Sequence, residues 1–279
     1  MQQYLTRKNI LLLIAGICAI VMIIGAVMII TITMRYRVGA NLYRDLEMHL
    51  SFPEAGEGTS VPARNPIEGD NNEEGEVGEW EETFTLPDHI VLPEVDFAGL
   101  EEINDNVVGW IILEGTPINY PVVQGEDNDF YLRHLFDGRW NPSGSIFVDY
   151  LNSSGFTDHH TIIYGHNMQD GSMFAAIEQY MSQEFYDNHP YIFLITPGRR
   201  YVIKPFAGYM ADTRMPSWRL QFEDAEDVAT WIADRRERSD FVSNTEALPH
   251  HRFITLSTCS SIWHDIRYVL VGRVMPITD

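Results

Sequence analysis

Cys259 is the residue of this chain that is best suited to act as a nucleophile. It ends the run FITLSTC (253–259), whose β-branched and apolar residues predict a strand with a thiol at its tip. The other cysteine, Cys18, lies in a long apolar segment near the N-terminus. We expect Cys18 to lie in a membrane and Cys259 in water, so the two should not form a disulfide. A thiol reacts as its thiolate and has an ordinary pKa of about 8.5, so it needs a base or a positive charge beside it.

His166 is the strongest candidate for that base. The apolar run 162–164 leads into Gly165 and then His166, as expected where a strand end presents a side chain, and imidazole exchanges protons near neutral pH. His159 and His160 are competitors, but the Thr- and Asp-rich sequence around them predicts a loop with no strand to position them. His264, which follows Cys259 closely, is a further alternative at the rim of the site.

Arg267 is the third candidate, at the start of the apolar strand 267–271. A short loop between neighbouring strands would return it to Cys259, where a guanidinium can only donate hydrogen bonds and positive charge. That chemistry suits an oxyanion or a substrate carbonyl. Ser257 and Thr258 make the surroundings of the cysteine polar, and we expect them to bind substrate. The spacing of these residues is not that of metal ligands, and we expect neither a metal nor a cofactor.

Many short strands with turn signals must position these side chains, so the sequence predicts a mainly β barrel or sandwich. Pro121 predicts an edge or a bulge in its strand. The predicted strands cover 107–113, 118–123, 144–148, 161–164, 191–196, 200–205, 207–210, 253–256 and 266–274. A short helical segment is expected over 96–106, and two longer helices over 172–186 and 224–238.

The N-terminal region predicts a membrane anchor. Residues 10–34 carry no charge and are rich in Ile, Val, Leu and Met, and roughly 20 such residues in a helix cross the hydrocarbon core. We therefore expect 1–35 to be a cytoplasmic tip and an uncleaved transmembrane helix, with a removable signal peptide as the alternative. Basic residues flank the apolar run on both sides, so charge alone does not set its orientation.

The segment after the anchor is strongly acidic. Ten acidic residues and one basic residue lie between Glu54 and Glu82, so we expect 36–87 to be a juxtamembrane segment and a disordered acidic stalk. The remaining residues, 88–279, are expected to form one catalytic domain that folds without the anchor. The net charge of −21 argues against nucleic-acid binding.

Several of these motifs resemble those of sortases, the membrane-anchored transpeptidases of Gram-positive bacteria. TLSTC (255–259) resembles the TLxTC signature of that family. The segments 164–168 and 170–174 are similar to the histidine region of class B sortases, and so are 106–111 and the motifs that follow it up to 128. The helix before the cysteine strand also fits class B.

The resemblance implies an eight-stranded sortase-type β-barrel with added helices. It implies that Cys259 attacks the carbonyl after a threonine in a C-terminal sorting signal, and that an amine resolves the acyl-enzyme. His166 would protonate the leaving amine and deprotonate the incoming one, and Arg267 would hold the substrate or its oxyanion. The implied partners are surface proteins with sorting signals and an amine of a peptidoglycan precursor or a pilin. The implied location is the cell membrane, crossed once, with the catalytic domain outside.

Two other functions stay open on the sequence. A hydrolytic cysteine protease would share the same chemistry and differ only in using water as the acceptor. A non-catalytic binding module on a stalk would not need the cysteine, histidine and arginine together. The sequence of the sorting signal is not readable from this chain.

Overall fold

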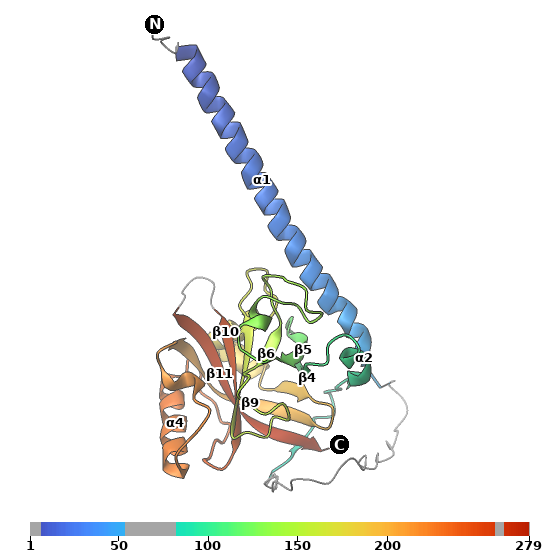
Figure 1. The fold of residues 1–279 in the computed structure, drawn as a ribbon. Coiled ribbons are helices and arrows are strands. Elements are labelled where there is room, and N and C mark those ends of the chain that lie inside the picture. Colours follow the sequence, from blue (N-terminus) through green and yellow to red (C-terminus); the bar gives the residue numbers. More distant parts are fainter. Residues whose placement is uncertain (1–6, 54–81, 260–264, 279) are drawn as a thin grey trace.

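The computed structural model describes residues 7–53, 82–259 and 265–278 of the chain. A β-barrel forms the body of the molecule, and one long helix projects from it (Figure 1). The predicted His264 lies outside the described residues, and so does most of the acidic segment.

Eight strands close into the barrel in the order β10-β7-β6-β5-β4-β8-β9-β11, and pairing between β10 and β11 closes the ring. The predicted eight-stranded, mainly β fold with added helices is therefore confirmed. Neighbouring strands are antiparallel except for two parallel pairs, β5 with β6 and β7 with β10. The strands are β4 (Val107–Ile112), β5 (Asn119–Gln124), β6 (Ile146–Val148), β7 (His160–His166), β8 (Ile192–Ile195), β9 (Arg200–Asp212), β10 (Arg252–Cys259) and β11 (Ile266–Thr278).

Prolines mark irregular places in the barrel. Pro121 lies in β5 and pairs with Trp110 of β4. On the other side of β5, the pairing with β6 begins only at Val122. No residue of β6 therefore lies opposite Pro121, and its missing N–H costs no hydrogen bond to β6. The two predicted strands 200–205 and 207–210 are one strand, β9. The register of β9 against β11 shifts between Val271 and Gly272, opposite Pro205, so the proline lies at an irregularity within a continuous strand.

The helix predicted over 224–238 is α4 (Ala225–Arg238). The Asp224 side chain caps it by accepting a hydrogen bond from the backbone N–H of Asp227. Trp231 packs its ring against Phe206 and Phe253, so α4 covers the part of the barrel that includes β9 and β10.

The helix predicted over 172–186 is instead two short pieces, a 3₁₀ helix η3 (Ala175–Met181) and α3 (Gln183–Asn188). Ser182 separates them because its backbone is extended and its hydroxyl accepts from the N–H of Phe185, which starts a new helix. The expected helical segment 96–106 is helical only over α2 (Phe97–Glu101).

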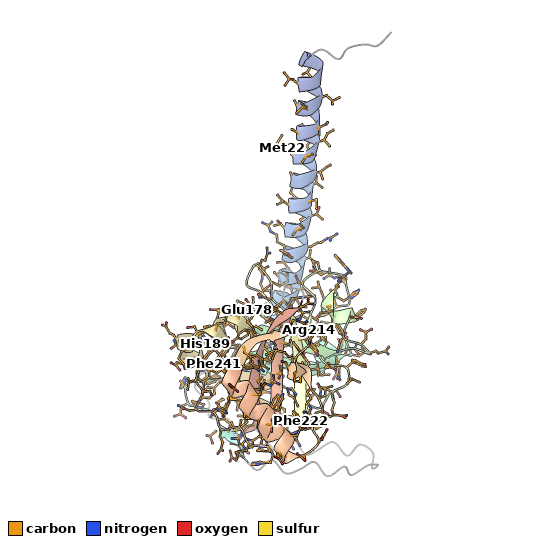
Figure 2. The ribbon with its side chains drawn as sticks, turned by 90° about the vertical axis from the view of Figure 1, so that its left-hand side faces the viewer. Met22, Glu178, His189, Arg214, Phe222 and Phe241 are labelled. Carbon is orange, nitrogen blue, oxygen red and sulfur yellow. The ribbon has the colours of Figure 1, made fainter. Side chains whose placement is uncertain are left out.

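The long projecting helix is α1 (Arg7–Leu46). Its apolar part is long enough to cross a membrane and has no contact with the barrel, as the side chains around Met22 show in Figure 2. It is compatible with a single membrane-spanning segment. The last turns of α1 differ from the prediction, because they pack onto the barrel: Tyr43 and Leu46 belong to its hydrophobic core.

Both ends of the acidic segment are attached to the barrel as well. A short 3₁₀ helix, η1 (Glu47–His49), leads into β1 (Leu50–Ser51), which pairs with β3 (Glu94–Val95). On the other side, β2 (Phe84–Thr85) pairs with β11 as an added strand. The described residues of 36–87 therefore pack onto the barrel at both ends, and the packed part begins well before 88.

Candidate active site

The parallel pairing of β7 and β10 brings two predicted residues together. In this register Cys259 lies opposite His166, at the C-terminal ends of both strands. Parallel strands present their C-terminal ends at the same edge, so a thiol and an imidazole placed at these ends share one rim of the barrel. The backbone of Cys259 is described, whereas its side chain lies outside what the structure describes.

Gly165, the residue before His166, has almost no space around it. A methyl group at this position would lie 2.5 Å from Cδ1 of Ile146 and 2.6 Å from Cγ of Phe174. Both neighbours are buried. Glycine is therefore required by close packing beneath the histidine, and this packing fixes the backbone that carries the imidazole.

His166 is held from its other side by a loop. Its Nε2 lies 2.7 Å from the carbonyl oxygen of Leu132, and because a carbonyl only accepts, Nε2 carries the proton. Nδ1 has no hydrogen-bond partner among the described residues and is the nitrogen free to accept a proton. After the histidine, the chain turns back so that the N–H of Phe174 donates to the His166 carbonyl over 2.9 Å.

The surroundings of His166 favour the neutral imidazole. Burial is the main cause of the lowered pKa of His166, and the nearby charges of Arg267 and Arg133 lower it further, while the bond to the Leu132 carbonyl opposes them. A neutral imidazole can act as a base toward a thiol or an amine, and its conjugate acid gives up its proton readily.

Arg267 lies at the start of β11, which is antiparallel to β10. The register pairs Ser257 with Val269, and the same offset continued toward the rim places Arg267 opposite Cys259. On its other side Arg267 pairs with Ala211 of β9. Its charge acts on His166, so the three predicted residues come from three adjacent strand ends at one rim.

Ser257 and Thr258 are fully buried, and their hydroxyls are occupied by protein groups. The Ser257 hydroxyl accepts from the indole Nε1 of Trp218 at 3.0 Å, and the Thr258 hydroxyl accepts from the backbone N–H of Tyr268 at 3.0 Å. Substrate binding by these two residues stays a prediction. Their contacts favour a role in holding the cysteine strand and the arginine strand.

His160 is not in the loop that the sequence indicates but begins β7, and it is completely buried. Its Nδ1 donates to the carbonyl of Arg219 at 2.6 Å, and its Nε2 lies 2.7 Å from the Thr255 hydroxyl. Burial lowers its pKa to about 4. This histidine joins β7 to β10 at the end of the pair opposite the rim and is not available to a substrate.

Two contributors to the site escape sequence reasoning. The Leu132 carbonyl that orients His166 is a backbone group, and nothing in a sequence distinguishes one carbonyl from another. Trp218, in the 3₁₀ helix η4 (Pro216–Trp218), reaches Ser257 from a segment nearly 40 positions away. A tryptophan beside Pro216 in a polar stretch was the only signal available.

The described residues contain one group with the spacing of metal ligands, formed by Glu82, Glu246 and His251. Arg273 forms ion pairs with both carboxylates and therefore already neutralises them. The group lies at the start of β10, at the opposite end from Cys259, and takes no part in the candidate site.

Chemically, the rim combines a thiol position, an imidazole and a guanidinium. A thiol attacks a carbonyl carbon, an imidazole moves the proton to and from the leaving and entering groups, and a guanidinium stabilises negative charge on oxygen. This set suits acyl transfer through a thioester.

Comparison with known proteins gives a consistent result, although no protein-family model matches the chain. It is 34% identical over 184 residues to sortase B of Staphylococcus aureus, covering 65% of this chain and 75% of that protein. It is 37% identical over 182 residues to sortase B of Listeria monocytogenes, covering 64% of this chain and 74% of that protein. Among solved structures, sortase B of S. aureus superposes with a TM-score of 0.63 at 34% identity, over 65% of this chain and 87% of that chain. Sortase B of B. anthracis superposes with a TM-score of 0.68 at 25% identity, over 88% of this chain and all of that chain.

Proposed function

Because this chain belongs to the class B sortases, which are cysteine transpeptidases, we propose that it cleaves a sorting signal after a threonine and transfers the acyl group to an amine. The observation that carries the proposal is the parallel register that pairs Cys259 with His166. The residues of the candidate site fit each step of such a reaction.

In the first step, the neutral imidazole of His166 takes the proton of the Cys259 thiol, and the resulting thiolate attacks the carbonyl carbon of the threonine. A C–S bond forms, and the carbonyl π electrons move to oxygen, which becomes an oxyanion. Arg267 is the guanidinium that would hold this oxygen, since the same register offset places it across from the cysteine. Removing one such donor typically costs about 10²–10³-fold in rate.

In the second step, the C–N bond breaks and the leaving amine takes a proton from His166. A thioester remains on Cys259. The imidazole is then neutral, which its buried position beside Arg267 favours. It next accepts a proton from the incoming amine, whose nitrogen attacks the thioester, and the thiolate leaves.

The partners follow from this chemistry and from the family. The donor is a surface protein with a C-terminal sorting signal, and the acceptor is an amine of a peptidoglycan precursor or a pilin. The apolar part of α1 supports a single-pass anchor in the cell membrane, and the family, not the helix, indicates that the barrel lies on the outer side. Ser257 and Thr258 line up next to Cys259 on β10 and would support its placement against the substrate.

Mass spectrometry of the protein incubated with sorting-signal peptides tests the nucleophile and the base. Cys259→Ala should form no acyl adduct, because the other cysteine, Cys18, lies in the apolar part of α1 that would cross the membrane, away from the site. His166→Ala should lose turnover while its thiol still reacts with a small alkylating reagent. His264→Ala is the control for the base. Cleavage by the Cys259→Ala variant, or an inactive His264→Ala beside an active His166→Ala, would overturn the assignment.

Arg267→Lys tests the guanidinium, because lysine keeps the charge and loses the planar pair of donors. Arg273, on the same strand, is a poor control because it is buried and paired with two carboxylates. Arg238→Lys is better matched, since Arg238 is an exposed helix residue paired only with Asp234 among the described residues. Cleavage rates that fall equally in both variants would remove Arg267 from the reaction.

Product analysis with and without an added amine separates transfer from hydrolysis. A transpeptidase should give the amine-linked product when the amine is present. Release of the free acid alone at saturating amine would instead favour the hydrolytic cysteine protease.

A further inference from the structure

The last turns of α1 are docked on the barrel and do not form a free tether. Gly39, Tyr43 and Leu46 follow one another at helical spacing and are buried. The Tyr43 hydroxyl donates to the carbonyl of Gly144 at 2.6 Å, and its ring packs edge-on against Tyr120. The direction of the membrane-spanning part of α1 is therefore fixed relative to the barrel.

A second contact lies at the point where the apolar run ends. Arg35 is the first charged residue after it. The Asn141 side chain donates to the Arg35 carbonyl at 2.9 Å, and the Arg35 guanidinium lies over the Trp140 ring at 4.8 Å from its centre. Asn141 is buried, whereas 52% of Trp140 is exposed. Trp140 thus lies at the depth of the boundary between the apolar and the charged part of α1.

Helix geometry places this contact in the lipid headgroup layer. That layer is about 5–8 Å thick on each side of the hydrocarbon core, whereas Leu46 lies about 16 Å beyond Arg35 at the helical rise of about 1.5 Å per residue. Arg35 and Trp140 are then in the headgroup layer, and the Tyr43 and Leu46 contacts are in water. Tryptophan and arginine are the side chains that favour this interface.

The same end of the barrel carries the candidate active site. Leu132, which orients His166, and Trp140 belong to one segment between β5 and β6, and Ser145 at its end contacts Tyr43 of α1 at 3.1 Å. Figure 2 agrees, because Arg214, next to the rim end of β9, lies on the side from which α1 projects, whereas Phe222 lies at the far end.

We propose that the barrel rests on the membrane surface with its Cys259–His166 rim toward the lipid headgroups, and that Arg35 and Trp140 make the contact. The proposal rests on the membrane anchor of the proposed function. It replaces a barrel held away from the membrane by the acidic segment, because Leu50 of β1 packs against the barrel core before that segment and β2 pairs with β11 after it. Membrane-bound reactants would then meet the site at the lipid surface.

Fluorescence of the full chain in phospholipid vesicles tests this contact. Phospholipids brominated on the acyl chain close to the headgroup quench tryptophans that lie at the interface. The difference in emission between the unchanged protein and Trp140→Phe comes from Trp140. These lipids should quench most of that difference. The emission lost in Trp231→Phe should be unquenched, since Trp231 is a buried residue of α4 whose ring packs between the helix and the barrel. Trp140 is half exposed, so its replacement by Phe leaves the core intact.

Flotation of the same vesicles separates the two possible failures. Protein that floats with the vesicles while its Trp140 emission is unquenched would overturn the surface contact and leave the anchor intact. Protein that does not float would overturn the anchor and the contact together. Flotation with selective quenching of Trp140 supports the proposal.

Discussion

Gly165→Ala is the substitution that should damage the candidate site most directly without removing any reacting group. The added methyl would lie 2.5 Å from Cδ1 of Ile146 and 2.6 Å from Cγ of Phe174. The Ile146 atom is the end of a flexible side chain, but the Phe174 atom is the base of a ring, and both residues are fully buried. Neither neighbour can move aside without disturbing the core.

The expected cost is that of overpacking a core, about 1–3 kcal/mol of the free energy of unfolding. For a domain of this size each kcal/mol corresponds to about 2–4 °C in Tm. The variant should therefore melt about 2–12 °C below the unchanged protein. Relief of the clash would move the backbone beside His166, and a misplacement of about 1 Å at a reacting group can cost about 10²-fold in rate.

Thermal unfolding and peptide cleavage measured on the same preparation check both effects. Cleavage is measured well below the Tm of the variant, so that loss of rate does not reflect unfolded protein. Gly198→Ala is the matched control, because a methyl there meets no atom within 4 Å. If Gly165→Ala matched Gly198→Ala in both Tm and kcat/KM, the idea that close packing fixes His166 would be refuted.

Three other outcomes are expected. Burial lowers the pKa of His160 to about 4 in the folded chain. The contribution of neutral His160 to the free energy of unfolding is therefore complete above the unfolded pKa of about 6.5 and is lost as the pH falls toward 4. Thermal unfolding across this range should show a loss of about 3 kcal/mol, and H160Q should remove most of this pH dependence. Arg267→Gln should raise the pKa of His166, because it removes a positive charge; an NMR titration showing no rise would contradict this. Thr258→Val leaves the Tyr268 N–H without its acceptor and should lower stability by about 1–3 kcal/mol with little change in KM, whereas a raised KM at unchanged Tm would show that Thr258 binds substrate.

The strands that carry the candidate residues were predictable because their patterns are local. The run 253–259 is β-branched and apolar and ends on Cys259, and β10 has these features in the structure. The capped, amphipathic stretch that forms α4 was equally clear. The eight-stranded ring followed from family motifs, since periodicity alone does not separate a barrel from a sandwich.

The errors come from contacts between distant segments. The polar residues around His160 predict a loop, yet hydrogen bonds to Arg219 and Thr255 satisfy both ring nitrogens inside the barrel. The sequence does not indicate the docking of α1, because Tyr43 and Leu46 lie among charged residues and a few buried positions make a weak pattern. The Gly144 carbonyl that binds the Tyr43 hydroxyl lies about 100 residues away, so the sequence nearby does not reveal the contact.

The contact between β10 and β11 changes from backbone to side chain next to the rim. Backbone pairing between the two strands extends to Ser257 and Val269. One residue further, the Tyr268 N–H donates to the Thr258 hydroxyl, so a side chain stands where the next backbone contact would be. This side-chain acceptor leaves no buried donor unsatisfied at Tyr268. Cys259 and Arg267 come directly after this contact, so it holds the two strand ends that carry the thiol position and the guanidinium next to each other.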